Sequence, residues 1–275
     1  MTRITANPHT HSTYVDGKNS LREMIETAIS MGFTALGFSE HARQRVDVGC
    51  GMTEEDEQNY INEVKALREE YAPRIRIWLG TEKDRLSPVD PAPYDYFLGA
   101  NHYLVSDTGE AGGVDNGKEF APWVEKHFGG DYVKAYEKYY DEYASYIEEV
   151  KPDIIAHFDL ICKYNRANHY FDETSEHYLA VAKRAMDRMI KVCRVMEVNT
   201  GGIARSNQPC PYPILPLLTY WHDLGGEVIP SSDCHRAHQL NAYFDECPEY
   251  LKKAGFDHIL TLGTGDTLFE VVPLE

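Results

Sequence analysis

The sequence predicts an α/β protein that folds as a barrel of seven or eight strand–helix units. Short apolar runs alternate with longer stretches of helical spacing along the 275 residues, and no repeat, linker or low-complexity segment divides them. Strands that alternate with helices are usually parallel and joined by crossover connections. A (β/α) barrel typically needs ~250 residues. We therefore expect a single domain that covers residues 1–275.

The expected strands are short apolar runs bounded by polar or turn residues. In chain order they are Ile4–His9, Ala35–Ser39, Ile75–Gly80, Tyr96–Ala100, Ile154–His157, Val195–Val198, Glu227–Pro230 and Ile259–Leu262. The expected helices lie between several of these runs, and the first of them follows a plausible N-cap at Ser20. They are Leu21–Met31, Glu54–Tyr71, Tyr132–Val150, Thr174–Val192 and Pro213–Leu224.

One segment, Ser106–Gly130, breaks the alternation. It is rich in glycine, aspartate and asparagine and ends in Gly129-Gly130. We interpret it as a long loop over one face of the domain. Long loops in compact domains are often lids or binding loops, and a mobile surface insertion is the alternative.

The charge and the apolar pattern exclude several classes of protein. Asp and Glu number 44 against 27 Lys and Arg, which gives a net charge of -17. Such a chain repels phosphate backbones at long range, so nucleic acid is not the expected partner.

No apolar run reaches the ~18 residues of a membrane span, and the polar start resembles no secretory signal. Six scattered cysteines suit reduced thiols. We expect a cytoplasmic protein; its oligomeric state stays open.

Histidines and carboxylates follow most of the apolar runs. In chain order these residues are His9, His11, Asp16, His41, Glu82, His102, His157, Asp233 and His235. The C-terminal ends of the strands in a parallel barrel converge on one mouth, where active sites lie. Side chains that are distant in sequence should therefore meet there. Bound divalent cations would relieve the conflict between so many imidazoles and carboxylates.

The first of these motifs has the geometry of a chelate. On an extended strand, His9 and His11 point to the same face because side chains alternate. Imidazole and carboxylate ligands suit zinc, manganese or iron. Nine candidate ligands exceed what one ion needs, since zinc takes about four. We therefore expect two to three divalent transition metals.

These motifs resemble those of the polymerase and histidinol phosphatase (PHP) superfamily. The resemblance rests on His9-Thr-His11, Ser39-Glu40-His41 and Ser232-Asp233-Cys234-His235, with Glu82, His102 and His157 in the expected order between them. The stretches Met31–His41 and Glu197–Gly202 are most similar to the monofunctional histidinol-phosphate phosphatases of that superfamily. The resemblance implies a distorted (β/α)7, TIM-like barrel with a trinuclear metal centre at its C-terminal mouth.

The resemblance also implies a distribution of the ligands. The first metal would use His9, His11, Glu82 and Asp233, and Glu82 would bridge to a second metal. The second and third sets are completed by His102 with His157, and by Asp16, His41 and His235.

The implied reaction is hydrolysis of L-histidinol phosphate, a small phosphate ester, by a hydroxide held between two metals. We expect Asp233 to accept a proton from the attacking water, and either Asp159 or His235 to protonate the leaving alkoxide. Arg205 is the first candidate for a phosphate clamp and Lys163 the second. Lys163 follows Cys162, which stands where the phosphatases should have a basic residue. The alternatives are a phosphodiesterase or nuclease of the same superfamily, a phosphatase of another small metabolite, and a metal-binding protein without catalysis.

Overall fold

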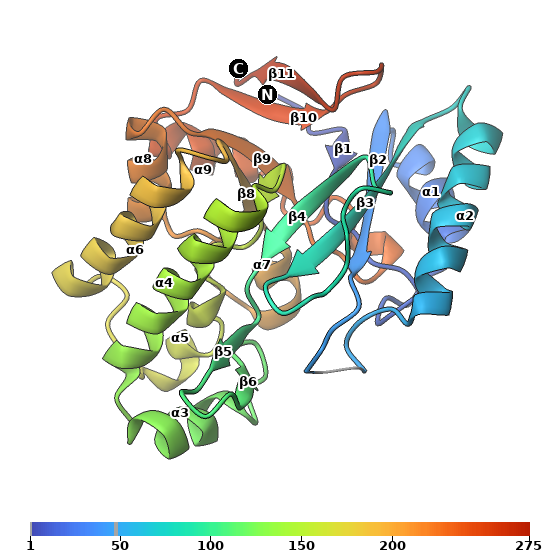
Figure 1. Ribbon diagram of the computed structural model, residues 1–275. Coiled ribbons are helices and arrows are strands. Elements are labelled where there is room, and N and C mark those ends of the chain that lie inside the picture. Colours follow the sequence, from blue (N-terminus) through green and yellow to red (C-terminus); the bar gives the residue numbers. More distant parts are fainter. Residues whose placement is uncertain (1, 47–48) are drawn as a thin grey trace.

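The computed structural model describes residues 2–46 and 49–275. Its main sheet has seven parallel strands in the order β1-β2-β3-β4-β7-β8-β9 (Figure 1). A single parallel bridge between Thr10 and Cys234 connects the first and last strand–helix units. The sheet therefore forms a nearly closed, distorted (β/α)7 barrel, and the predicted fold class is confirmed. The strands are β1 (Ala6–Asn7), β2 (Ala35–His41), β3 (Arg76–Asp84), β4 (Tyr96–Ala100), β7 (Ile154–Ile155), β8 (Val195–Asn199) and β9 (Glu227–Ser231).

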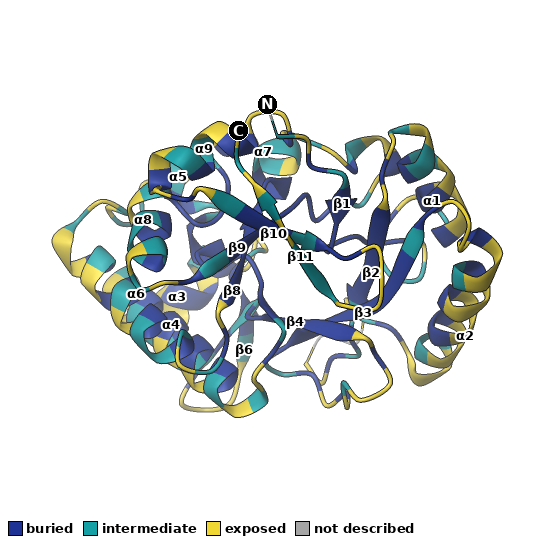
Figure 2. Cartoon of the chain, turned by 90° about the horizontal axis from the view of Figure 1, so that it is seen from above, coloured by how far each residue is buried: buried dark blue, intermediate teal, exposed yellow. Residues whose placement is uncertain are grey.

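Two of the outer helices begin where local sequence signals indicate. Helix α1 (Leu21–Ser30) starts at Ser20, whose side chain forms a reciprocal capping box with Glu23. Helix α2 (Glu54–Tyr71) uses Thr53 and Asp56 in the same way. These helices and the four that follow on the other side present buried apolar faces to the sheet (Figure 2). The four are α4 (Tyr132–Val150), α6 (Glu176–Met189), α8 (Leu215–Asp223) and α9 (Cys247–Ala254).

The eighth apolar run does not become a barrel strand. It forms β10 (His258–Leu262), which pairs with β11 (Phe269–Pro273) in an antiparallel hairpin. The hairpin lies across the end of the barrel where the strands begin (Figures 1 and 2). There Leu260 and Leu262 pack in a buried cluster with Trp78, whose indole N–H donates to the Gly263 carbonyl at 2.8 Å. The hairpin thus fills the barrel at the end opposite the mouth.

The segment Ser106–Gly130 is more regular than the loop that its composition predicts. It contains β6 (Ala111–Gly113), which pairs with β5 (Tyr103–Val105), and helix α3 (Phe120–Phe128). Pro122 lies in the first turn of this helix, where a missing N–H costs nothing. Composition misled the prediction because this proline and the neighbouring glycines occupy helix ends and a hairpin rather than a continuous loop. The β5–β6 unit lies at the end of the barrel opposite the β10–β11 hairpin (Figure 1).

Short elements complete the mouth: α5 (Asn165–Asn168), α7 (Gly201–Ser206) and single 3-10 turns at Leu160–Cys162 and Ala237–Gln239. Across residues 2–46 and 49–275, none of the helices has both the length and the apolar character that crossing a bilayer requires.

Candidate metal centre

The nine predicted ligands lie together at the C-terminal mouth of the barrel. They form three groups, and within each group the potential ligand atoms lie within 4.8 Å of one another. The groups are His9, His11 and Asp233; Glu82, His102 and His157; and His11, Asp16, His41 and His235. Each of them lies near the C-terminal end of a barrel strand or in the segment that follows it, which explains why residues distant in sequence meet here.

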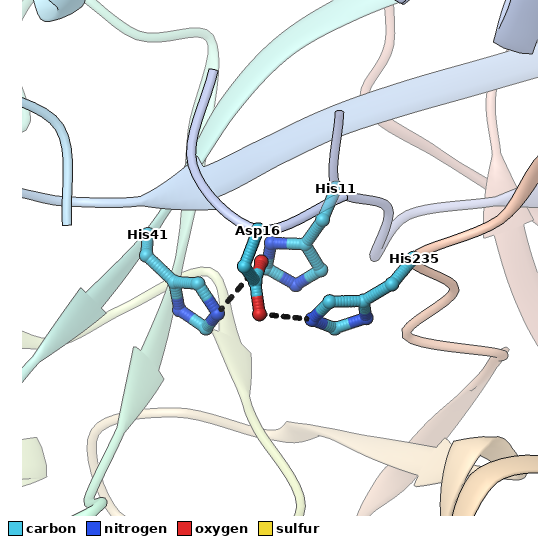
Figure 3. Close-up of side chains that lie close together, drawn as sticks. All are labelled: His11, Asp16, His41 and His235. Carbon is cyan, nitrogen blue, oxygen red and sulfur yellow. Dashed lines mark ion pairs between the residues drawn. The ribbon is translucent and has the colours of Figure 1, made fainter. Parts of the chain in front are cut away.

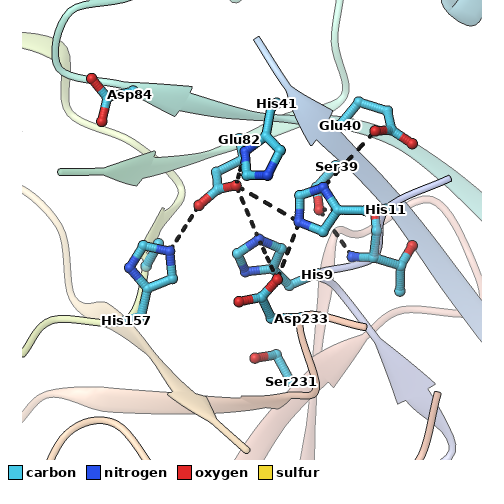
Figure 4. Close-up of polar contacts among 12 residues, drawn as sticks. His9, His11, Ser39, Glu40, His41, Glu82, Asp84, His157, Ser231 and Asp233 are labelled. Carbon is cyan, nitrogen blue, oxygen red and sulfur yellow. Dashed lines mark hydrogen bonds and ion pairs between the residues drawn. The ribbon is translucent and has the colours of Figure 1, made fainter. Parts of the chain in front are cut away.

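Glu82, in β3, lies at the centre of the cluster and faces two groups of imidazoles (Figure 4). Its Oε2 atom is 2.7 Å from Nδ1 of His41 and 3.4 Å from Nε2 of His9. Its Oε1 atom is 2.8 Å from Nε2 of His157 and 3.4 Å from Nε2 of His102. One oxygen thus faces His9 and His41 and the other faces His102 and His157. A carboxylate that bridges two metal ions requires this geometry.

Asp233 approaches the same cluster from the segment that follows β9. Its Oδ1 atom is 3.2 Å from Nε2 of His11 and 3.7 Å from Nε2 of His9. The backbone of Asp233 has a φ of 46°, a left-handed conformation that is uncommon outside glycine. Strained backbone of this kind is found mainly where function requires it. At this position it accompanies a carboxylate that faces the centre of the mouth.

The third group surrounds Asp16 (Figure 3). The Asp16 oxygens lie 3.0 Å from Nε2 of His235 and 3.8 Å from Nε2 of His41. The His11 ring stacks on both of these imidazoles, with centroids 4.2 and 4.3 Å apart. Burial opposes ionisation of Asp16, but the hydrogen bond from His235 and the neighbouring imidazoles hold the pKa of this carboxyl well below its usual range.

Two further carboxylates orient the imidazoles from behind. Oε1 of Glu197 is 2.6 Å from Nδ1 of His9, and Oδ2 of Asp84 is 3.2 Å from Nδ1 of His102. Such contacts fix the tautomer and direct Nε2 of each ring towards the metal side. Glu197 is fully buried and also accepts the backbone N–H of His157 at 2.6 Å and the hydroxyl of Ser231.

Sequence reasoning did not assign a role to either carboxylate. Asp84 follows Glu82 by two residues on one strand, so the alternation of side chains predicts that both face the barrel interior. Glu197 is an acidic residue inside an otherwise apolar run. A buried carboxylate requires partners. Both signals could have identified these residues.

The chemistry of the cluster fits divalent metal ions. The Nε2 atoms of His9 and His11 and Oε2 of Glu82 are buried and have no hydrogen-bond partner in the part of the chain that the structure describes. Buried polar atoms are normally satisfied, so atoms that converge without a partner call for an explanation such as a bound ion. Imidazole nitrogens and carboxylate oxygens together suit zinc, manganese or iron.

Metal binding by these residues should release protons. Burial opposes protonation of His11, but the neighbouring carboxylates of Asp233 and Glu40 raise its pKa to about 10 in the metal-free chain. Burial also opposes protonation of His102, and Glu82 is the main cause that raises its pKa to about 9. Both rings are therefore charged at pH 7.5 and must lose a proton before they bind a metal. The apparent zinc affinity should rise from pH 6 to pH 9.

Calorimetry at pH 7.5 in buffers of different ionisation enthalpy checks this prediction. We expect at least one proton to be released as the zinc sites fill. Zinc binding that releases no proton, with an affinity independent of pH, would contradict the protonation states inferred for the metal-free centre.

Arg205 occupies the place that the sequence predicted for it. It lies in α7, and its Nη2 atom is 2.6 Å from Oδ2 of Asp233, while Nη1 contacts His235. Helix α7 can approach the mouth because a Cβ on Gly201 would lie 2.5 Å from the Ser232 carbonyl oxygen. The guanidinium therefore reaches the ligand cluster.

The two candidates for the acid that protonates the leaving group differ in position. Asp159 is fully buried outside the three ligand groups; its Oδ2 atom accepts the backbone N–H of Ile214 at 3.0 Å, and burial raises its pKa to about 7. His235 lies at the mouth, but burial and the nearby His11 lower its pKa to about 4. The geometry thus suits His235 as a neutral ligand and places Asp159 in a buried site outside the ligand groups; protonation of the leaving group by either residue stays a prediction.

A cavity of about 320 Å³ opens above the ligands. Asp16, His41 and His102 form part of its lining, and the β5–β6 unit with the residues after it supplies a further part, including Asp115 and Glu119. Lys163 lies near this cavity, with Nζ 3.5 Å from Oδ2 of the lining Asp115. The space beside the candidate metals is therefore bordered by carboxylates, with one lysine near them.

Comparison with known proteins finds similar chains that cover most of this sequence. Residues 7–201 match the family model of the PHP domain. A Schizosaccharomyces pombe protein named "probable histidinol-phosphatase" is 24% identical over 282 residues, which cover 95% of this chain and 90% of that protein. A crystal structure from Listeria monocytogenes has the same fold, with a TM-score of 0.70 and 18% identity over 88% of this chain and all of that chain.

A second crystal structure contains ligands. It is a histidinol phosphate phosphatase from Lactococcus lactis in complex with zinc, L-histidinol and phosphate. Its TM-score is 0.61, with 18% identity over 94% of this chain and 97% of that chain. At this identity the comparison establishes a common fold.

Proposed function

This chain belongs to the PHP domain family, and from that premise we propose that it is a metal-dependent phosphomonoesterase that hydrolyses L-histidinol phosphate to L-histidinol and phosphate. This reaction is a step of histidine biosynthesis. The observation that carries the proposal is Glu82, whose two oxygens face imidazoles on opposite sides of the mouth beneath an open cavity. A second support is the relative named as a histidinol-phosphatase that aligns over almost the whole chain.

The proposed centre holds two to three divalent metals. His9, His11, Glu82 and Asp233 would hold the first; the set of Glu82 with His102 and His157 and the set of Asp16, His41 and His235 would hold the others. When bound, such metals lower the pKa of water towards ~7 and neutralise the phosphate oxygens. Zinc is the first candidate because it is the metal in the Lactococcus lactis enzyme.

The residues of this chain contribute binding and proton transfer. Asp233 has one oxygen towards His9 and His11 and the other against Arg205, so it is placed to accept a proton from an attacking water as well as to ligate. The guanidinium of Arg205 can bind two phosphate oxygens through parallel hydrogen bonds. Asp115 and Glu119 would attract the cationic amine of histidinol.

A comparison of substrates tests the proposal. We expect kcat/KM for L-histidinol phosphate to exceed that for p-nitrophenyl phosphate by orders of magnitude, because only the former carries an amine that the acidic cavity can bind. Single-stranded DNA and p-nitrophenyl phosphodiesters should be poor substrates, in line with the net charge of -17. Equal rates for the two monoesters would indicate a general phosphatase, and preferred cleavage of diesters would indicate a nuclease.

Arg205→Ala should lower kcat/KM for L-histidinol phosphate about ten- to a hundredfold. The variant loses hydrogen bonds to a charged group, which contribute roughly 1.5–3 kcal/mol, and the retained ligands should keep the metal content unchanged. Steady-state kinetics and elemental analysis measure the two effects. Wild-type kcat/KM would show that Arg205 does not bind the phosphate. Loss of metal would show instead that Arg205 supports the ligands through Asp233.

A further inference from the structure

We propose that Gln208 is a positioning residue that sets the relative placement of Arg205 and Lys163, the first and second candidates for binding the phosphate. The inference rests on the proposed function, since it assumes that phosphate binds at this mouth. The reason to look for such a residue is the local structure. Arg205 lies in the six-residue helix α7, and Lys163 ends a three-residue 3-10 turn. Elements this short cannot hold a side chain in place through their own hydrogen bonds.

Gln208 connects the two segments through hydrogen bonds to both. Its Nε2 donates to the carbonyl oxygen of Lys163 at 2.7 Å, and its backbone N–H donates to the carbonyl oxygen of Gly202 at 3.2 Å. The chain can return in this way because Asn207, with a φ of 50°, ends α7 in the left-handed conformation. The carbonyl of Lys163 is thereby linked to the first turn of the helix that carries Arg205.

The third contact fixes the amide itself. Oε1 of Gln208 accepts from Nη1 of Arg166 at 2.9 Å, and Nε of Arg166 is 3.0 Å from Glu173. The Gln208 side chain is therefore oriented from both ends, and only 6% of this residue is exposed. An amide buried to this degree is costly unless its partners are present.

Close packing makes the connection stiff. A Cβ on Gly202 would lie 2.6 Å from the Tyr212 ring and 3.1 Å from Cγ of Gln208, so helix α7 has no room to shift towards either. Displacement of Gln208 should therefore move α7, and with it the guanidinium of Arg205. Since phosphate binding by an arginine depends on geometry, a small movement of this helix should weaken it.

Phosphate binding to the zinc-loaded protein tests the inference without requiring turnover. Inorganic phosphate is the probe and calorimetry the measurement. Gln208→Ala should weaken phosphate binding about tenfold, with the zinc content unchanged. Gln58→Ala, at an exposed glutamine of α2, is the matched control and should bind as the parent does. If Gln208→Ala does not fold, Gln208→Glu serves instead, because it keeps an acceptor for Arg166 but cannot donate to the Lys163 carbonyl.

A double-mutant cycle distinguishes positioning from general destabilisation. In an Arg205→Ala background the Gln208 substitution should cost less than threefold, because its main target is gone. Unchanged phosphate affinity in the single variant, or the same tenfold loss in both backgrounds, would overturn the inference. A parent that binds phosphate in a Gln208-dependent way yet does not hydrolyse L-histidinol phosphate would refute the proposed function and leave the positioning role in place.

Discussion

Glu82→Gln should remove at least one equivalent of metal and lower kcat/KM by about a thousandfold or more. The substitution keeps the shape of the side chain but replaces the charged oxygen that faces His102 and His157, or the one that faces His9 and His41, by an amide N–H₂. An amide cannot bridge two cations. Metal activation stabilises the transition state by several kcal/mol, and each 1.36 kcal/mol of that stabilisation changes the rate tenfold.

Elemental analysis of gently purified protein and steady-state kinetics measure the two effects of this substitution. Glu69→Gln, at an exposed position of α2, makes the same chemical change away from the mouth and should leave both unchanged. A Glu82→Gln variant with full metal content and near-normal kcat/KM would refute the bridging role and the assignment of the two metals on either side of it.

Glu197→Gln should weaken metal binding about 10- to 100-fold, the usual effect of removing a carboxylate that orients a ligating histidine. The loss should be large here because this one carboxylate accepts Nδ1–H of His9, the backbone N–H of His157 and the hydroxyl of Ser231. Bonds to an ionised acceptor are about twice as strong as neutral ones. His9 and His157 belong to different ligand groups, so both groups should be affected.

Competition for zinc with a chelator of known affinity measures this effect, and thermal unfolding of the metal-free protein shows whether the variant is folded. Ser231→Ala is the matched control, since it removes one hydrogen-bond donor but keeps the charge of Glu197. The decrease in the logarithm of its zinc affinity should be less than a third of the decrease in Glu197→Gln. An equal loss in both variants would indicate that packing around Ser231, rather than the charge that orients His9, determines the affinity.

The convergence of the candidate ligands could be predicted from the sequence because parallel strands in a barrel end at the same mouth. His41, Glu82 and Asp233 follow apolar runs that are easy to recognise, so their meeting required no knowledge of side-chain geometry. The same rule predicts that Arg205 lies near the mouth, since α7 follows directly after β8.

Other features depend on contacts between distant residues and have no local signature. The run Ile259–Leu262 has the pattern of a barrel strand. Because seven other strands already form the barrel, this run pairs with β11 instead. Asp159 follows β7 by a few positions, but the backbone N–H of Ile214 that its carboxylate accepts could not be predicted from the sequence. Gln208 could not have been identified, since its partners lie on another strand–helix unit.

The bridge between Thr10 and Cys234 joins segments that are made at the beginning and near the end of translation. Asp16 and His235, which lie 3.0 Å apart, come from opposite ends of the sequence. During translation the first histidines emerge long before the last carboxylate and imidazole, so the first and third ligand groups are incomplete until the final strand–helix unit has been made. Only the group of Glu82, His102 and His157 can form earlier. An ion captured by the completed third group would then join the N-terminal and C-terminal units, in addition to the backbone contacts that connect them.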